Sequence, residues 1–512
     1  MSPPTLEAEK LRSHPSRDRL PGTLQGNVTG EGTGAKALCH RDTPRPENRD
    51  GLRILQVSTA DLLGGAERIA ANLHQAYLDA GHASSLAVGR KHGEAPGTFR
   101  INPSVGGGAW RRLWWGGHHR LASWPRRGKG WRFLLRAFKT VAEPGHLLDL
   151  LGGTEDFRFP GSWRLLEQAP ARPDILHCHN LHGWYFDLRA LARLSREVPT
   201  LLTLHDAWLL TGHCAHFIDC DRWKTGCGRC PDLTLYPALL RDGTARNHAR
   251  KTEIYAGCRV HVATPCRWLM DRVIESILAP AVVTGRVIHN GVDLSIFRPA
   301  DKAAARAALD IPPEADVLLF SALGVTQNQW KDYATMREAV GRLAARRRGG
   351  RLLFLALGEA RPSCRLADAE IRFIPHEPDP RTVARYYQSA DVYVHASRAD
   401  TFPTSILEAL ACGTPVVATA VGGIPEQIRS IPLPGATGEA HADGEPNGAL
   451  IPRGDAEAMS RAIARLLDEP ALLLRLGRQA AADAGRRFDM KRAAATYLAL
   501  YEEMLDGEPR RA

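Results

Sequence analysis

The sequence lacks any long apolar run and contains little cysteine. No stretch approaches the roughly 18 uninterrupted apolar residues that a membrane-spanning helix needs, and the N-terminus has no apolar core like that of a secretory signal. Only 10 of the 512 residues are cysteine, too few for a disulfide scaffold. We therefore expect a cytoplasmic protein whose thiols are reduced, with some of them available as metal ligands.

The composition that remains is that of a soluble globular protein. Hydrophobic residues make up 44% and charged residues 24%, and 512 residues are too many for one ordinary core, so two or three domains are expected. The formal charge of +11 predicts an anionic partner, which could be a nucleic acid, a phosphate ester or a membrane. Residues 1–50 have no apolar period and are predicted to be a disordered tail.

Short apolar strands alternate with amphipathic helices from residue 51 onward. "ILQV" precedes a glycine turn and the helical stretch "AERIAANLHQAYLDAGH", and "SSLAV" follows as the next strand. This βαβ order implies a parallel sheet covered on both faces. A second such series begins near residue 315, which predicts an α/β protein with two Rossmann-like halves. We expect a first Rossmann-like domain over residues 51–290, with a basic, Trp-rich insertion at 106–142, a second Rossmann-like domain over 291–485, and a closing helix over 486–506 that packs back on the first domain.

One carboxylate precedes the apolar stretch "TFPTSILEALACG", a second lies inside it, and glycines follow. Backbone N–H groups at the predicted helix start, near Thr404 and Ser405, form an anion site. One turn further, Glu408 could accept both hydroxyls of a ribose, as the acid of dinucleotide-binding folds does. Asp400 could reach a second polar group of the same ligand. The pattern predicts a nucleotide diphosphate carrying a polyol, although an ordinary helix acid and a turn acid would give the same short motif.

The whole stretch, "ADTFPTSILEALACGTPVVATAVGGIPE", resembles the nucleotide-sugar signature of glycosyltransferase family 4. The family's glycine loop, interdomain segment, basic donor loop and closing helix resemble "LLGGAER", "IHNGVDLSIFRP", "NQWKDY" and "FDMKRAAATYLALYEEML". The resemblance runs from about Leu52 to Asp506. "PDILHCHNLHG", "TLHDAWLLTGHC" and "RWKTGCGRCP" are most similar to enzymes of colanic-acid and exopolysaccharide assembly.

The resemblance implies a GT-B fold, in which two Rossmann-like domains face a cleft. It implies a hexosyl transfer with retention of anomeric configuration, from a nucleotide-diphosphate sugar held by the C-terminal half to an acceptor held by the N-terminal half. No further cofactor is required for the chemistry. By position, Asp400 matches the acid that contacts the donor sugar, Glu408 the acid on the ribose, and Lys331 the diphosphate-binding lysine.

Three more matched positions lie in the N-terminal half. Gly64 and Gly65 match the loop that approaches the phosphates, and His205 matches the histidine near the reacting sugar. A hydrogen-bonded histidine at the end of a strand is the alternative for His205. The sequence also departs from the family pattern, because residues 326–329 lack the basic residue expected shortly before Lys331.

Four cysteines follow the spacing C-x5-C-x6-C-x2-C. The C-x2-C end is typical of a zinc knuckle, whereas the wider spacings are less usual. A structural zinc site is one hypothesis, and packing thiols or a labile disulfide are the alternatives. A catalytic metal is not expected, because Lys331 and the helix terminus already supply positive charge. The four cysteines are Cys214, Cys220, Cys227 and Cys230.

The insertion is basic and rich in tryptophan. From Trp110 to Lys139 it holds nine Arg or Lys, five Trp and no acid. Near its end, Trp131, Leu134 and Phe138 share one helical face, a pattern that suits the interface of an anionic membrane. An amphipathic helix packed on the core is the alternative.

Taken together, the sequence predicts a retaining glycosyltransferase of polysaccharide biosynthesis. Its partners would be a nucleotide sugar, a glycan or lipid-linked acceptor and an anionic membrane surface, which would place it peripherally on the inner face of the membrane. A GT-B-fold sugar-nucleotide epimerase is the alternative enzyme. A nucleic-acid-binding protein is the alternative outside enzymes, but the sequence has no recognition motif for nucleic acid.

Overall fold

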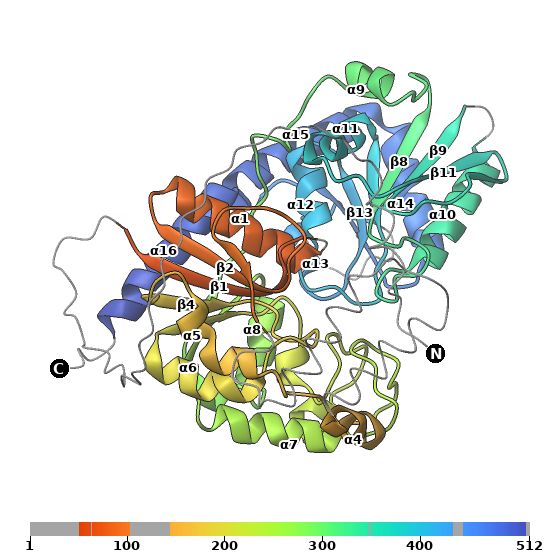
Figure 1. Ribbon diagram of the computed structural model, residues 1–512. Helices are drawn as coiled ribbons and strands as arrows, with labels where there is room; N and C mark the ends of the chain where they lie inside the picture. Colours follow the sequence, from red (N-terminus) through yellow and green to blue (C-terminus); the bar gives the residue numbers. More distant parts are fainter. Residues whose placement is uncertain (1–50, 63, 103–143, 348–349, 434–443, 508–512) are drawn as a thin grey trace, which may run out of the picture. The chain divides into compact units, whose positions relative to one another are not determined.

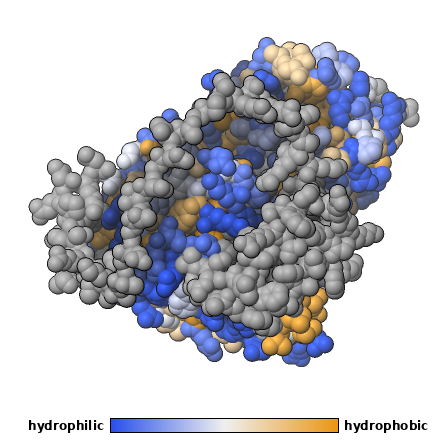
Figure 2. All heavy atoms as spheres, viewed as in Figure 1, coloured by the Kyte–Doolittle hydropathy of each residue, from blue (hydrophilic) through white to orange (hydrophobic). Residues whose placement is uncertain are grey.

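The computed structural model describes residues 51–62, 64–102, 144–347, 350–433 and 444–507 (Figure 1). The predicted tail at 1–50 and the Trp-rich insertion at 106–142 lie outside the described residues. Within the described residues, no helix is long and apolar enough to cross a membrane. On the face shown in Figure 2, hydrophilic residues predominate among those that are coloured.

The first half of the chain forms a seven-stranded parallel sheet with the strand order β3-β2-β1-β4-β5-β6-β7. The central strands are buried along their whole length, as expected when helices cover both faces. The order reverses between β1 and β4, so polar side chains at that edge lie where such sheets bind ligands. The strands are β1 (Arg53–Ala60), β2 (Ala83–Arg90), β3 (Thr98–Arg100), β4 (Ile175–Cys178), β5 (Thr200–Thr203), β6 (Val260–Thr264) and β7 (Val282–Val287).

A second seven-stranded sheet has the order β10-β11-β9-β8-β12-β13-β14. All of its neighbours pair in parallel except β10 and β11, which pair antiparallel. Its order reverses between β8 and β12. The strands are β8 (Asp316–Ser321), β9 (Leu352–Leu357), β10 (Cys364–Leu366), β11 (Ala369–Ile374), β12 (Val392–His395), β13 (Val416–Thr419) and β14 (Gly448–Ile451).

Amphipathic helices connect the strands of both sheets. In α1, for example, Ile69, Leu73 and Tyr77 recur on one face and are buried. The first half contains α1 (Gly65–Asp79), α4 (Pro144–Gly152), α5 (Leu165–Gln168), α6 (Leu191–Glu197), α7 (Thr244–Tyr255) and α8 (Arg267–Ile274). The second half contains α9 (Lys302–Ala308), α10 (Tyr333–Arg346), α11 (Pro380–Ser389), α12 (Thr404–Ala411), α13 (Ile424–Gln427), α14 (Ala456–Asp468), α15 (Pro470–Arg487) and α16 (Met490–Asp506).

The two chain crossings between the sheets lie side by side. The N–H of Val292 donates to the carbonyl of Phe488 at 2.7 Å, and the N–H of Met490 donates to the carbonyl of Val292 at 3.1 Å. Gly291 permits this approach, because a Cβ there would lie 2.5 Å from Met490 Cα. Since Asp50–Ala512 form one compact unit, the domain boundary expected at residues 290–291 stays a prediction.

After the second crossing, α16 lies against α1 and the first sheet (Figure 1). The Tyr501 hydroxyl is 3.0 Å from the Tyr77 hydroxyl and 2.7 Å from His177 Nδ1. The Tyr497 hydroxyl is 3.2 Å from Thr203 Oγ1. All of these side chains are buried. His177 is therefore part of the packing between the sheet and the last helix.

We expect Tyr501→Phe to destabilise the protein by about 1–3 kcal/mol, because it leaves the Tyr77 hydroxyl and His177 Nδ1 without this buried partner. Tyr77→Phe should cost about 0.5–1.5 kcal/mol, because the Tyr501 hydroxyl keeps its contact with His177. The double variant should lose less free energy of unfolding than the two single variants do together, since with both hydroxyls removed neither is left without the other as its partner. Urea denaturation of the four proteins completes the cycle. Strictly additive losses would show that the two hydroxyls do not interact.

Candidate functional site

The residues predicted to bind a nucleotide sugar gather at the carboxyl edge of the second sheet. Strand β12 ends at His395, and α12 begins at Thr404 after Pro403, whose extended backbone ends the loop. The N–H of Ser397 donates to Thr419 Oγ1 at 2.9 Å, which fixes the loop to the end of β13. Gly422 is required here, because its φ is +57° and a Cβ would nearly overlap the carbonyl oxygen of Asp400. The glycines of the motif thus let the chain pack directly on the acidic loop.

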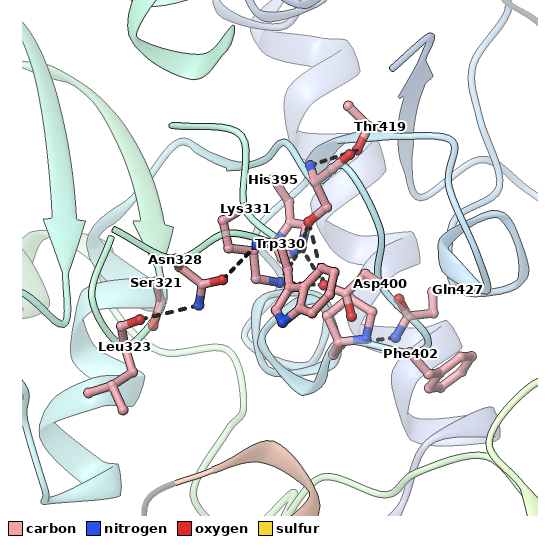
Figure 3. A network of polar contacts seen from close by, with 12 residues as sticks. Ser321, Leu323, Asn328, Trp330, Lys331, His395, Asp400, Phe402, Thr419 and Gln427 are labelled. Carbon is pink, nitrogen blue, oxygen red and sulfur yellow. Dashed lines mark hydrogen bonds and ion pairs between the residues drawn. The ribbon is translucent and has the colours of Figure 1, made fainter. Parts of the chain in front are cut away.

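Lys331, His395 and Asp400 point toward one another (Figure 3). Lys331 Nζ forms a short ion pair with Asp400 Oδ2 and lies 3.1 Å from His395 Nε2, which is 3.3 Å from the same carboxylate oxygen. The N–H of Asp332 donates to the carbonyl of Ala396 at 3.0 Å and so holds the lysine loop beside β12. The structure therefore brings together a lysine and an acid that are 69 residues apart in the sequence.

Burial and charge act differently on these three groups. Burial alone would raise the pKa of Asp400, but Lys331 and His395 outweigh it and hold that pKa well below its usual range. Burial, with the neighbouring Lys331 charge, lowers the pKa of His395 to about 4. Near neutral pH the cluster therefore contains a carboxylate and a neutral imidazole. An anionic ligand would compete with Asp400 for the lysine.

Glu408 is buried in α12 and has partners on both oxygens. Its Oε1 accepts a bond from Arg68 Nη1 at 3.2 Å, and its Oε2 accepts one from the Tyr387 hydroxyl at 2.8 Å. Burial raises the pKa of Glu408, while Arg68 and Tyr387 oppose that shift. The sequence analysis missed Arg68, which lies 340 residues from Glu408 and belongs to α1 of the first half.

The glycine loop lies against the start of α12. A Cβ added at Gly65 would be 4.0 Å from Thr404 Oγ1, and Thr404 and Ser405 are half-buried. Gly64 is the residue before α1, in an extended conformation, and the Glu67 carboxylate folds over it. The predicted glycines and the first N–H groups of α12 thus border the same space as Glu408.

His205 lies just beyond the end of β5 and contacts a second histidine. Its Nε2 is 3.0 Å from His179 Nδ1, and burial lowers the pKa of His205 to about 4. The next residue, Asp206, has its Oδ2 2.7 Å from His182 Nε2. Burial would lower the pKa of His182, but Asp206 outweighs it and raises that pKa. On this edge, Asp206 therefore favours the charged form of His182, whereas burial favours the neutral form of His205.

Two further contacts join the halves of the chain. Glu426, the acid of the "GGIPE" motif, accepts bonds from the N–H groups of Arg267 and Trp268, each at 2.8 Å, and so caps α8. The His216 ring contacts the Trp330 ring with centroids 4.8 Å apart, beside Lys331. The motif predicted a glycine turn and an acid at this place, but not that the acid would cap a helix of the other half.

The predicted zinc site is not supported by the structure. All four cysteines are free, and within the described ranges no group of three or more His, Cys, Asp or Glu side chains is arranged to hold a metal ion. Cys227 Sγ accepts a bond from the N–H of Gly212 at 3.3 Å, and Cys230 Sγ lies 3.3 Å from His213 Nε2. Burial raises the pKa of Cys214 to about 12 and that of Cys227 to about 11, so these thiols are protonated. The alternative of packing thiols fits these contacts.

In a pH titration followed by NMR of labelled histidine side chains, we expect His205 and His395 to stay neutral until about pH 4. Burial disfavours their charged forms. His182 should instead lose its proton above the ordinary histidine pKa, because Asp206 stabilises its charge. Single His→Asn variants would assign the signals. Titration of His205 or His395 at or above pH 6.5 would contradict this description of the site.

Comparison with known proteins agrees with this arrangement. Residues 63–296 match the family model described as Glycosyltransferase Family 4, and residues 315–469 match that described as Glycosyl transferases group 1. The chain is 27% identical over 382 residues to a putative colanic acid biosynthesis glycosyl transferase, WcaC, of Escherichia coli, covering 72% of this chain and 83% of that protein. It is 29% identical over 354 residues to D-inositol 3-phosphate glycosyltransferase 1 of Catenulispora acidiphila, covering 66% and 74%.

Solved structures share the fold. Sucrose-phosphate synthase from Thermosynechococcus elongatus superposes with a TM-score of 0.56 at 19% identity, over 89% of this chain and all of that one. Anabaena HepE in complex with UDP-glucose gives a TM-score of 0.54 at 16% identity, over 88% of this chain and all of that one. The predicted α/β GT-B fold and the predicted enzyme class are confirmed. The chain belongs to the glycosyltransferases that combine a family 4 N-terminal domain with a group 1 C-terminal domain.

Proposed function

We propose that this glycosyltransferase moves a hexosyl group from a nucleotide-diphosphate sugar to a glycan or lipid-linked acceptor in polysaccharide assembly, with retention of configuration. The observation that carries the proposal is the Lys331–Asp400–His395 cluster beside the start of α12. The similarity to WcaC, a putative colanic acid biosynthesis glycosyl transferase, supports the polysaccharide context. The UDP-glucose complex of HepE supports the donor class. Retention rests on the family resemblance.

The C-terminal side offers one partner for each part of such a donor. Lys331 would exchange Asp400 for the diphosphate, for which an ammonium is a suitable point charge. The first N–H groups of α12, at Thr404 and Ser405, would bind phosphate oxygens. Glu408 would accept the ribose hydroxyls while the Tyr387 hydroxyl keeps its carboxylate in place. Gly64 and Gly65 would let the phosphates approach the loop closely.

Arg68 offers the positive charge that the lysine loop lacks. Residues 326–329 contain no basic side chain, but Arg68 already reaches Glu408, beside the start of α12. When ribose hydroxyls occupy Glu408, the guanidinium would be free to turn toward the diphosphate. A planar guanidinium binds phosphate oxygens in pairs. The proposed site would then hold two cations, one from each half of the chain.

At the reacting centre, Asp400 would contact the donor sugar once Lys331 has left it. The neutral His205 would accept a hydrogen bond near the reacting carbon, which a protonated histidine could not do. The negative charge that develops on the leaving diphosphate would be stabilised by Lys331 and by the N-terminus of α12. No step in this scheme needs a metal ion.

We expect Glu408→Gln to weaken donor binding and Asp400→Asn to lower mainly kcat. One acid would hold the ribose throughout, whereas the other would act at the sugar. Each loss should correspond to roughly 1.5–3 kcal/mol, the usual value of a hydrogen bond to a charged group. Thermal shift with UDP- and GDP-sugars would measure binding, and NMR of the product would report its anomeric configuration. Exposed Glu314→Gln serves as the control, and unchanged kinetics in both site variants would remove this proposal.

We also propose a membrane-docking face. Helix α4, which directly follows the insertion, exposes four leucines, the most exposed being Leu148 at 71%. An orange patch lies in Figure 2 where Figure 1 places α4. The basic, Trp-rich sequence from Trp110 to Lys139, which precedes this helix in the chain, has the composition of a segment that binds an anionic bilayer interface. The other exposed leucines are Leu147, Leu150 and Leu151.

Liposome flotation tests the membrane proposal. Wild type should float with anionic vesicles at low salt and detach as salt increases, because the attachment is partly electrostatic. A Leu148→Ser, Leu151→Ser double variant should float less. The control is Leu474→Ser, at an exposed position of α15. Equal flotation of all three proteins, or of none, would rule out α4 as a docking face.

A further inference from the structure

A pocket lined by aromatic rings lies beside the His182–Asp206 pair. About 380 Å³ of non-atom space lies within it, part of which is open solvent, and its walls come from the loops after β4 and β5 and from two other loops of the first half. None of these residues belongs to the proposed donor site. Its aromatic lining consists of Phe157, Phe159, Trp184, Phe186, Trp208 and Tyr236.

Trp184 is held in a costly conformation at the rim of this pocket. Its φ of 61° is in the left-handed region, which bulky side chains rarely adopt, and 55% of its side chain is exposed. Gly183 before it also has a positive φ, of 102°, and contacts Thr59 closely. Both the backbone strain and the exposure of a large ring oppose folding. Among the described residues, no hydrogen bond or ring contact of the Trp184 side chain accounts for either feature, whereas a ligand that stacks on the ring would account for both.

Three other rings of the pocket lining lie close to one another. The His182 ring lies with its centroid 5.5 Å from both the Trp208 ring and the Tyr236 ring. The Tyr236 hydroxyl is 3.4 Å from His182 Nδ1, and Tyr236 is among the exposed large side chains. Trp208 is fixed from behind, since its Nε1 donates to Glu155 Oε1 at 2.5 Å and Lys251 Nζ lies 3.8 Å from its ring centroid. The pocket lining therefore combines three rings held in place by these contacts with the exposed ring of Trp184.

The charges around the pocket indicate the class of ligand. Three cationic groups beside the pocket already have partners: His182 is 2.7 Å from Asp206, Lys251 is 3.1 Å from Glu155, and Arg250 donates to the Glu155 carbonyl and lies over the Phe157 ring. Arg90 also acts electrostatically on Tyr236, but it does not line the pocket. Apolar rings combined with hydroxyl, imidazole and carboxylate groups suit a ligand that has both C–H faces and hydroxyls. An uncharged pyranose ring has that chemistry.

The pocket is linked to the donor cluster by one residue. His216 interacts electrostatically with both Asp206 and Asp400, and its ring contacts Trp330, the neighbour of Lys331. Asp206 in turn adjoins His205, the histidine proposed to lie near the reacting sugar. A ligand in the pocket would thus lie on the acceptor side of the Lys331–Asp400 pair.

We propose that this pocket binds an uncharged pyranose ring of the acceptor glycan, stacked on Trp184. The inference rests on the proposed function and specifies its acceptor. Recognition is of the sugar itself and not of a lipid-carrier phosphate. The wall of His182, Trp208 and Tyr236 limits the depth of the ring, and Trp184 covers its open face.

Saturation-transfer NMR tests the pocket without knowledge of the natural acceptor. The probes are the methyl glycosides of glucose, galactose, mannose and fucose, with glucose 6-phosphate as the charged comparison. At least one methyl glycoside should bind wild type and Trp184→Phe, and glucose 6-phosphate should bind less than methyl glucoside. Trp184→Ala should weaken sugar binding by roughly two- to ten-fold, the loss expected for one stacking contact. Leu474→Ala, on α15, is the control and should bind as wild type does.

Binding of no methyl glycoside, or equal binding by Trp184→Ala and wild type, would overturn the inference. A separate measurement distinguishes failure of the proposed function. Trp184→Ala should keep the full thermal shift with UDP- or GDP-sugars, because the donor site does not include Trp184. If only Trp184→Ala loses that shift, the variant damages the fold, and Trp184→Phe becomes the deciding protein. Trp184→Phe keeps an aromatic ring, so if it retains the donor shift but binds sugar more weakly than wild type, the stacking role is contradicted.

Discussion

The largely buried ion pair between Lys331 and Asp400 is the interaction on which the arrangement of the proposed donor site depends. Two charges out of water are costly unless each has a partner, and removing one leaves the other uncompensated. Here the carboxylate also contacts His395 and Ser397, so the pair fixes the end of β12 and the lysine loop together. The site is thus assembled before any ligand enters, with an internal carboxylate in the position of an anionic ligand.

The second organising feature is the set of contacts between the two halves. The crossings at Val292 and Met490 run side by side, Arg68 reaches Glu408, and Glu426 caps α8. Two of these three involve the proposed donor motif or the residues just after it. Binding of a nucleotide sugar at the proposed site would therefore be coupled to the relation of the two sheets, because a ligand that replaces Arg68 on Glu408 would change a contact between them.

Much of the fold was predictable, because strands buried on both faces read as short apolar runs. The edge strands β3, β7, β10 and β14 were missed. Strand β7 is largely exposed, and β3 and β10 are only three residues long, so none of these three strands forms a buried apolar run that the sequence would reveal. The acid motif predicted Asp400, Glu408 and the start of α12, but not Arg68 or His395, since spacing along one segment does not specify contacts with distant ones. The zinc prediction failed for a similar reason, because cysteine spacing does not determine where the thiols point. Burial and local hydrogen bonds instead keep these thiols protonated and apart from any metal-binding arrangement within the described residues.

The cap that Glu426 provides has a consequence for motion. Its two oxygens satisfy the N–H groups of Arg267 and Trp268 only while the halves stay together. Separating them would expose a helix start, at a cost of about 0.5–2 kcal/mol, as for the loss of an N-cap. That free energy biases the ratio of closed to open molecules by roughly two- to thirty-fold. The last acid of the signature would thus favour the arrangement in which the halves are together over any in which they separate.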